Sequence, residues 1–200
     1  MNHSVHSKTA VKILEASLPL FAARGYNGVA MRDIAQTVGI TAAALYNHFP
    51  SKETLYFKAL EYAFANKVDT FATDLAKAKD LDGRLLCIVV FWIEIFSGDV
   101  ILRSLLQREM SDADEQRLQL LLDRVFLPIY QGADDTIEEL AKGKMDKNLL
   151  FFAIIGLILS HFQLTPIRKR LPGAKPEHED ADVITSHILT LLRHALLLAH

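Results

Sequence analysis

The chain has 200 residues and a mass of 22.4 kDa, and half of its residues are hydrophobic, so it can bury a sizeable core and is not intrinsically disordered. The net charge of −2, with a sequence pI near 6.4, gives no sign of a nucleic-acid partner, but the charge is uneven. Residues 1–60 carry six Lys or Arg and three Asp or Glu, a net charge of +3, which leaves −5 for residues 61–200.

A single cysteine, Cys87, excludes an intrachain disulfide and fits a reducing compartment. The first residues lack the apolar stretch of a secretion signal, and the longest apolar run, residues 149–159, is too short to span a bilayer. We therefore expect a cytoplasmic protein without a membrane partner.

The spacing of hydrophobic residues predicts an all-α chain, because no segment shows sustained alternation of apolar and polar residues. The expected helices cover about residues 7–24, 31–38, 42–49, 51–79, 82–96, 100–109, 112–142, 146–165 and 180–199. In the first helix, Ser7 is the expected N-cap, Gly25 ends the helix, and Pro19 suggests a kink. Its inward face is expected to hold Val11, Leu14, Leu18 and Phe21.

Residues 25–55 have the spacing of a helix-turn-helix. The first short helix turns Ile34, Ala35 and Val38 inward, and Gly39 supplies the positive φ angle of the turn. Thr41 can cap the second helix, whose Leu45 and Phe49 point inward one turn apart.

The opposite ridge of that second helix holds Ala42, Ala43, Tyr46 and Asn47. Small residues at its N-terminal end and hydrogen-bonding residues further along suit insertion into a major groove. Tyr46 and His48 can reach phosphates, and Lys52 adds a positive charge in the first turn of the next helix.

These residues carry a family resemblance. The segment MRDIAQTVGITAAALYNHFPSKETL, together with the preceding FAARGY, resembles the DNA-binding head of the TetR (tetracycline repressor) family over about residues 10–57, most specifically in residues 45–53. The resemblance implies phosphate contacts by Thr41, Tyr46, His48 and Lys52. It also implies that Arg32, Ala42, Ala43 and Asn47 face bases or the nearby backbone. Val29 and Ala30 stand where the family often has Thr or Ser, so a capping hydrogen bond worth about 1 kcal/mol is missing unless another group supplies it.

The remaining sequence carries no catalytic motif and no paired cysteines, and its eight histidines lack metal-ligand spacing, so we expect neither an enzyme nor a metal or other cofactor. Aromatic residues on the central helices either pack the core or line an apolar cavity. By the resemblance, the effector pocket lies in this body, and the candidate lining residues are Trp92, Phe96, Phe126, Tyr130 and His161. His161 either supplies a polar group to the ligand or is an ordinary core histidine. Arg168 to Arg170 are interpreted as cations at a helix C-terminus, and His178 as a solvated loop residue.

The sequence thus predicts a helix-turn-helix DNA-binding domain over residues 1–55 and a helical effector-binding and dimerisation domain over residues 56–200. The expected function is that of a repressor that binds a near-palindromic, double-stranded operator as a homodimer and is released by a small, largely apolar effector. The last expected helix has two apolar stripes. One holds Ile184, Ile188, Leu191, Ala195 and Leu198, and the other holds Leu189, Leu192 and Leu196. One stripe is expected to serve the monomer's core. The other is expected to pair, with residues 146–165, against a second copy. A helical adaptor without DNA binding is the alternative, and an enzyme acting in the body cavity is a third option.

Overall fold

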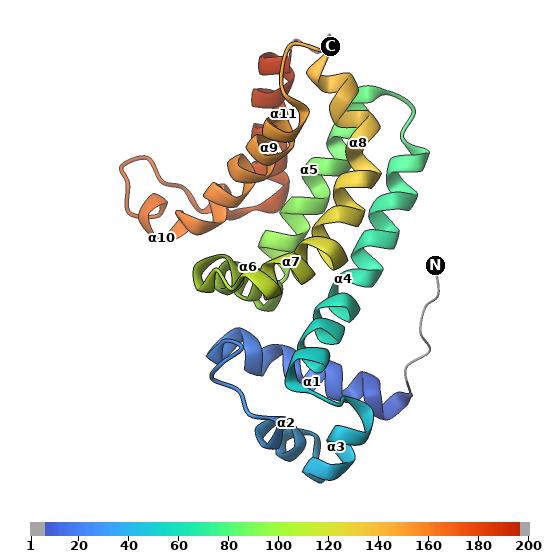
Figure 1. The fold of residues 1–200 in the computed structure, drawn as a ribbon. Helices are drawn as coiled ribbons and strands as arrows, with labels where there is room; N and C mark the ends of the chain where they lie inside the picture. Colours follow the sequence, from blue (N-terminus) through green and yellow to red (C-terminus); the bar gives the residue numbers. More distant parts are fainter. Residues whose placement is uncertain (1–6, 197–200) are drawn as a thin grey trace. The chain divides into compact units, whose positions relative to one another are not determined.

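The computed structural model describes residues 7–196, apart from the side chain of Asn66, and this part of the chain is helical without any strand (Figure 1). The α-helices are α1 Lys8–Arg24, α2 Met31–Val38, α3 Ala42–His48, α4 Lys52–Lys77, α5 Leu81–Gly98, α6 Val100–Asp112, α7 Glu115–Leu121, α8 Leu127–Ala141, α9 Lys147–Gln163, α10 Thr165–Arg168 and α11 Ala181–Leu196. The all-α prediction is confirmed. The expected helix over residues 112–142 is instead α7, a π-helical turn Leu122–Phe126 and α8, and a short 3-10 helix, Pro176–Glu179, precedes α11.

The helices form two compact units. Unit 1 comprises Met1–Asn66 with Ile101–Leu127, and unit 2 comprises Lys67–Val100 with Pro128–His200. Residues 101–127 therefore pack with the N-terminal helices, although the sequence suggests no such association. The boundary expected at residue 55 divides a DNA-binding domain from an effector-binding domain, and this division stays a prediction.

In unit 1, α1 is bounded as the sequence predicts. The side chain of Ser7 accepts a hydrogen bond from the Ala10 N–H at 3.2 Å, and the N–H of Gly25, with φ at +71°, donates to the Phe21 carbonyl. The predicted inward face is only partly right, because Val11 and Leu18 are half-buried and the buried face comprises Ala10, Ile13, Leu14, Ser17 and Phe21. Ser17 can be buried because its hydroxyl donates to the Leu14 carbonyl at 2.8 Å.

A buried polar network joins α4 to α6 and α7 inside unit 1. The Tyr56 hydroxyl donates to Glu109 at 2.7 Å, and the Arg117 Nε donates to the other oxygen of the same carboxylate at 2.9 Å. Arg117 also pairs with Asp112 at 3.1 Å and with Asp114 at 3.4 Å. Glu109 is 2% and Arg117 is 6% exposed, so each charge depends on the other for compensation.

The core of unit 2 forms where α5 packs against α9 and α11. Trp92 stacks on Phe96 with ring centroids 5.7 Å apart, and Phe151 lies edge-on to Trp92 at 6.5 Å and to Tyr130 at 5.0 Å. Arg193 of α11 forms a two-pronged ion pair with Asp82 of α5 at 2.6 and 2.7 Å. The aromatic packing therefore joins α5, α8 and α9, and the ion pair joins α11 to α5.

The two stripes predicted on the last helix do not divide as expected. Leu192 and Leu196 are buried together with Ile184, Ile188 and Leu189, whereas Leu191 is exposed. The helical period alone does not produce this division, because residue 191 lies two turns after residue 184 and points in nearly the same direction. The packing of α11 against α5 and α9 decides which side of the helix is covered. Leu198, assigned to a stripe from the sequence, lies outside the described residues.

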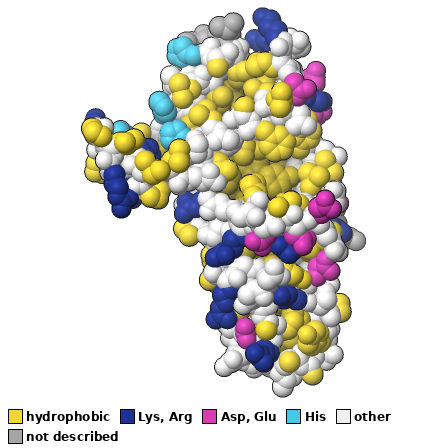
Figure 2. Space-filling view, turned by 60° about the vertical axis from the view of Figure 1, so that its left-hand side comes forward, with side chains coloured by type: hydrophobic (Ala, Val, Ile, Leu, Met, Phe, Trp, Pro, Cys, Tyr) yellow, Lys and Arg dark blue, Asp and Glu magenta, His cyan; other side chains and the backbone are white. Residues whose placement is uncertain are grey.

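One side of α9 remains uncovered within unit 2. Leu150, Phe151, Ile154, Ile155 and Ile158 are buried, but Leu149 is 72% and Phe152 is 54% exposed. Gly156 shares this outer side, and a Cβ atom built there would meet nothing within 4 Å. Figure 2 shows hydrophobic side chains gathered on the surface of unit 2, with histidine side chains beside them. No single helix among residues 7–196 is long and apolar enough to cross a membrane, although α5 and α6 together satisfy that test by length and composition.

Candidate nucleic-acid interface

Helices α2 and α3 form the predicted helix-turn-helix. Gly39 adopts the left-handed conformation, with φ at +78° and ψ at +35°, and its N–H donates to the Ala35 carbonyl at 3.0 Å. Thr41 then begins α3 by accepting a hydrogen bond from the Ala44 N–H at 3.1 Å. The Lys12 ammonium donates to the Val38 carbonyl at 3.2 Å and so satisfies the C-terminal end of α2. The predicted turn and cap are confirmed.

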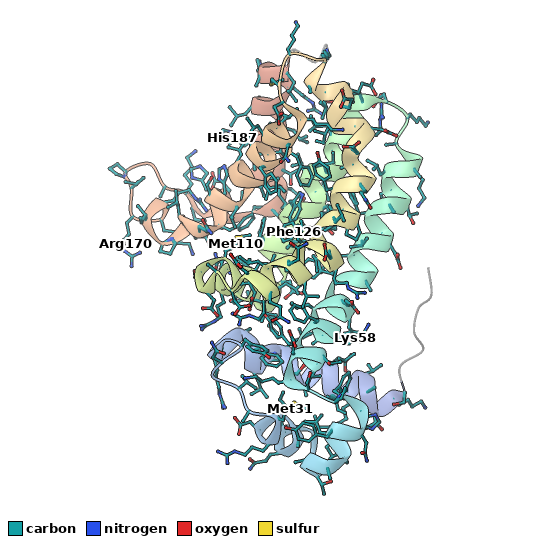
Figure 3. The ribbon with its side chains drawn as sticks, in the orientation of Figure 1. Met31, Lys58, Met110, Phe126, Arg170 and His187 are labelled. Atoms are coloured by element: carbon teal, nitrogen blue, oxygen red, sulfur yellow. The ribbon has the colours of Figure 1, made fainter. Side chains whose placement is uncertain are left out.

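The inner faces of the two helices are apolar, as predicted. Ile34 and Leu45 are fully buried, Phe49 is 3% exposed, and Met31 lies inside the helical head (Figure 3). This packing holds α3 rigidly and turns one ridge outward. Every expected contact residue on and beside that ridge is exposed: Thr41, Ala42, Ala43, Tyr46, Asn47 and His48.

Arg32 is exposed at the start of α2, with 86% of its side chain accessible and its Nε 3.8 Å from the Asp33 carboxylate. That carboxylate also accepts a hydrogen bond from the Ala30 N–H at 3.3 Å and pairs with Arg24 at 3.4 Å. Asp33 therefore satisfies one backbone donor at the helix start where the sequence lacks a capping Ser or Thr. Its charge also suits the N-terminal end of α2.

Lys52 makes contacts that the sequence did not predict. Its ammonium donates to the Tyr26 carbonyl at 2.9 Å and to the Val29 carbonyl at 3.1 Å, and it lies 4.3 Å from the centre of the Tyr26 ring. Burial, and secondarily the positive charge of Arg117, lower the pKa of Lys52. Two of its three N–H groups thus hold the segment between α1 and α2, which leaves one for a phosphate oxygen.

The candidate effector-binding residues fall into both units. Phe126 belongs to unit 1, and the other four belong to unit 2. Trp92 and Phe96 are buried and stack on each other, while Tyr130 and His161 are half-buried.

His161 lines a cavity of about 360 Å³ in unit 2, together with Arg168, His178, Val183, Ile184 and His187. Sequence reasoning missed these five residues, because it interpreted Arg168 as a helix-terminal cation and His178 as a loop residue. The only sequence signal was the recurrence of histidine and basic residues on both sides of the loop before α11. Among residues 7–196, no group of three His, Cys, Asp or Glu is arranged to hold a metal ion.

Comparison with known proteins agrees with this arrangement. Residues 13–59 match the model of the family described as bacterial regulatory proteins, tetR family. IcaR of Staphylococcus epidermidis, a negative transcriptional regulator of the icaADBC biofilm operon, is 33% identical over 72 residues, which are 36% of this chain and 39% of that protein. The match thus spans well under half the length of this relative.

Two solved structures share the fold over most of the chain. FadR of Bacillus subtilis, in complex with stearoyl-CoA, has a TM-score of 0.73 and 16% identity, covering 91% of this chain and 96% of its own. AibR, in complex with isovaleryl coenzyme A and operator DNA, has a TM-score of 0.66 and 20% identity, covering 92% of this chain and 97% of its own. The helix-turn-helix geometry, its exposed ridge and the match over residues 13–59 together identify the N-terminal part of the chain as a DNA-binding domain of the tetR family of bacterial regulatory proteins.

Proposed function

We propose that the protein is a DNA-binding transcriptional repressor that acts as a homodimer. The observation that carries the proposal is the outward ridge of α3, which is small at its N-terminal end, polar further along, and held by a fully apolar inner face. A protein-docking surface would be expected to present larger apolar anchors at its centre. An adaptor function therefore fits this ridge less well than DNA binding does.

The residues of the ridge have separate roles in this proposal. Ala42 and Ala43 allow the helix to approach the base edges closely, and the Asn47 amide reads one base. Tyr46, His48 and the backbone near Thr41 contact phosphates and fix the register. Arg32 adds a positive charge beside the groove. Lys52 has a double role, since it orders the segment from Tyr26 to Val29 and offers its remaining N–H to a phosphate.

DNA binding is tested by selecting sites from a random double-stranded library and measuring affinities against salt. Asn47→Ala should relax preference at one base position in each half-site by about 1–3 kcal/mol. Arg32→Gln should weaken binding to all sequences and lower the salt slope by about one unit for each half-site. Lys144→Gln, an exposed lysine change in unit 2, is the control and should alter neither quantity. If the library yields no enriched site, or Asn47→Ala binds the selected site unchanged, the proposal fails.

Dimer formation is supported by the uncovered side of α9. Two large apolar residues there, Leu149 and Phe152, are more than half exposed, and Gly156 leaves room for another helix to approach closely. Leu191 adds exposed apolar surface on α11, which packs against α9. A second copy pairing these two helices with its own would form a four-helix interface related by a two-fold axis. The operator would then be a near-palindrome.

Phe152→Glu tests this interface, because it places a charge at the centre of the proposed contact, on the exposed side of α9. Light scattering should report a monomer for this variant and a dimer for the unchanged chain. Val100→Glu alters another apolar residue, 59% exposed at the start of α6, and should remain a dimer. A dimer that persists in Phe152→Glu at micromolar concentration would exclude this face.

The proposed effector is a small, largely apolar molecule bound in unit 2, with Trp92, Phe96, Tyr130 and His161 as candidate contacts. FadR and AibR, which share the fold, were solved with molecules that carry acyl chains. Because Trp92 and Phe96 stack closely, a ligand entering beside them must move the rings and the helix that carries them. Compounds should release the operator only if they bind the released state better. Trp92→Ala, which removes the central ring, should abolish that release.

A further inference from the structure

The cavity of unit 2 is assembled from four consecutive elements at the C-terminal side of α9. Its lining residues come from α9, α10, the 3-10 helix and α11: His161, Arg168, His178, Val183, Ile184 and His187. With a volume of about 360 Å³, it lies at the small end of the range of ligand-binding pockets.

Arg168 brings an unsatisfied donor to this cavity. Its Nη2 reaches the Thr165 hydroxyl at 3.4 Å, but its buried Nε has no hydrogen-bond partner in the described part of the chain. A buried donor without a partner costs free energy, so such groups generally have an acceptor in the functional state. The planar guanidinium presents its donors in a fork that matches the two oxygens of a carboxylate.

Three histidines line the same cavity as Arg168, and no carboxylate is among the lining residues described. The rings of His161 and His187 lie edge to face with centroids 6.0 Å apart. Burial, then the proximity of His187 and of Arg168, lower the pKa of His161, so its imidazole is mainly neutral at pH 7. The Nδ1 of His178 accepts a hydrogen bond from the Lys175 N–H at 3.3 Å, which leaves its Nε2 as a donor.

The acidic residues of the 3-10 helix are already engaged by lysines. Glu179 pairs with Lys169 at 2.7 Å, and Glu177 pairs with Lys175 at 3.7 Å. One permanent positive charge and several imidazole donors therefore remain for a ligand. A singly charged anion matches that charge better than a dianion does.

Part of the lining is apolar, since Ile184, which is 3% exposed, and Val183 from the same turn of α11 line the cavity. We propose that this cavity binds a small organic monocarboxylate, with its carboxylate on the Arg168 guanidinium and its hydrocarbon chain against Val183 and Ile184. The site shares only His161 with the effector contacts expected from the sequence, and it can be tested without DNA.

The test is calorimetric titration of the full-length protein with hexanoate, compared with hexanamide and inorganic phosphate. Hexanoate should bind, and hexanamide, which has the same shape without the charge, should bind roughly ten-fold or more weakly. Inorganic phosphate should not compete, because it lacks the apolar chain. Failure of hexanoate to bind at millimolar concentration, or equal binding of phosphate, would overturn the proposal.

Two arginine variants locate the site. Arg168→Gln should weaken hexanoate binding roughly ten- to hundred-fold. Arg170→Gln changes a neighbouring exposed arginine, whose guanidinium contacts the Pro166 carbonyl and which Figure 3 shows pointing away from α11, so binding should be unchanged. Equal weakening in both variants would indicate diffuse attraction by positive charge and would refute the assigned contact.

A third variant tests where the hydrocarbon chain of the ligand lies. Ile184→Val keeps the charged wall and removes one methylene from the apolar wall, so hexanoate affinity should fall by a few-fold while butyrate affinity changes less. Unliganded Arg168→Gln should bind the selected operator normally, which makes failure of this site distinguishable from failure of the DNA-binding proposal. Unchanged hexanoate affinity in Ile184→Val would contradict the position of the chain.

Discussion

The two units of the molecule are stabilised by different interactions. Unit 1 buries a charged network, in which Glu109 accepts from both Tyr56 and Arg117, and the same arginine lies 4.8 Å from the centre of the Tyr26 ring. Unit 2 has an aromatic and aliphatic core and leaves large apolar side chains of α9 exposed. Directional polar contacts fix one geometry, whereas a large exposed apolar face commonly marks a site of interaction with another molecule. In unit 1 the buried polar network fixes α4 against α6 and α7, and in unit 2 the exposed side of α9 is the surface on which the proposed dimer depends.

The largest expected effect separates the interior of unit 2 from its surface on a single helix. Leu192→Asp places a carboxylate among apolar residues and should destabilise the fold by at least about 4 kcal/mol. Leu191→Asp, one residue earlier and exposed, should unfold at nearly the same temperature as the unchanged chain and should weaken only dimer formation. Thermal unfolding followed by circular dichroism distinguishes them, and equal loss of stability would show that residue 191 is also buried.

The buried network of unit 1 should be nearly as sensitive. Arg117→Met leaves the Glu109 carboxylate buried with Tyr56 as its remaining described donor. We therefore expect the free energy of unfolding, measured by urea denaturation, to fall by about 3–5 kcal/mol. Arg124→Met is the matched control, because Arg124 pairs with Glu61 at 3.3 Å with more than half of its side chain exposed. That surface pair should contribute at most about 1 kcal/mol. Similar losses of unfolding free energy in both variants would mean that the buried network stabilises unit 1 no more than a surface ion pair does.

A smaller effect is expected at the end of α1. The Arg108 guanidinium donates to the carbonyls of Ala22 and Ala23, each at 2.8 Å, and so satisfies the last turn of that helix from α6. Arg108→Gln should cost about 1 kcal/mol and speed amide exchange in the residues that follow α1. Met110→Gln, a change at an exposed neighbour on α6, should leave that exchange unchanged.

The smallest expected effect concerns the dependence of stability on pH. Burial, and then the neighbouring His187 and Arg168, lower the pKa of His161 below the usual histidine value of about 6.5, so the unfolded chain takes up a proton before the folded one as the pH falls. This residue should therefore make stability fall as the pH drops through about 6.5, with no contribution above about 7.5. His161→Gln should show a weaker loss of unfolding temperature between pH 7.5 and 5.5. A steeper loss of unfolding temperature in the variant would contradict the lowered pKa assigned to His161.

The sequence by itself determined the local structure of the DNA-binding head. Ser7, Gly25, Gly39 and Thr41 act at helix ends where only short-range backbone geometry matters, so their roles follow from residue type and spacing. The exposed ridge of α3 follows in the same way from the helical period that buries Leu45 and Phe49.

Only the tertiary structure decided the contacts between distant segments. The pairing of Arg117 with Glu109 beside Tyr56, the attachment of Lys52 to the segment before α2, and the cavity around Arg168 each bring together residues from separate helices. The division of the last helix into buried and exposed sides also depended on where α5 and α9 lie. Periodicity states which residues share a face, but whether that face is covered depends on what the rest of the chain packs against it.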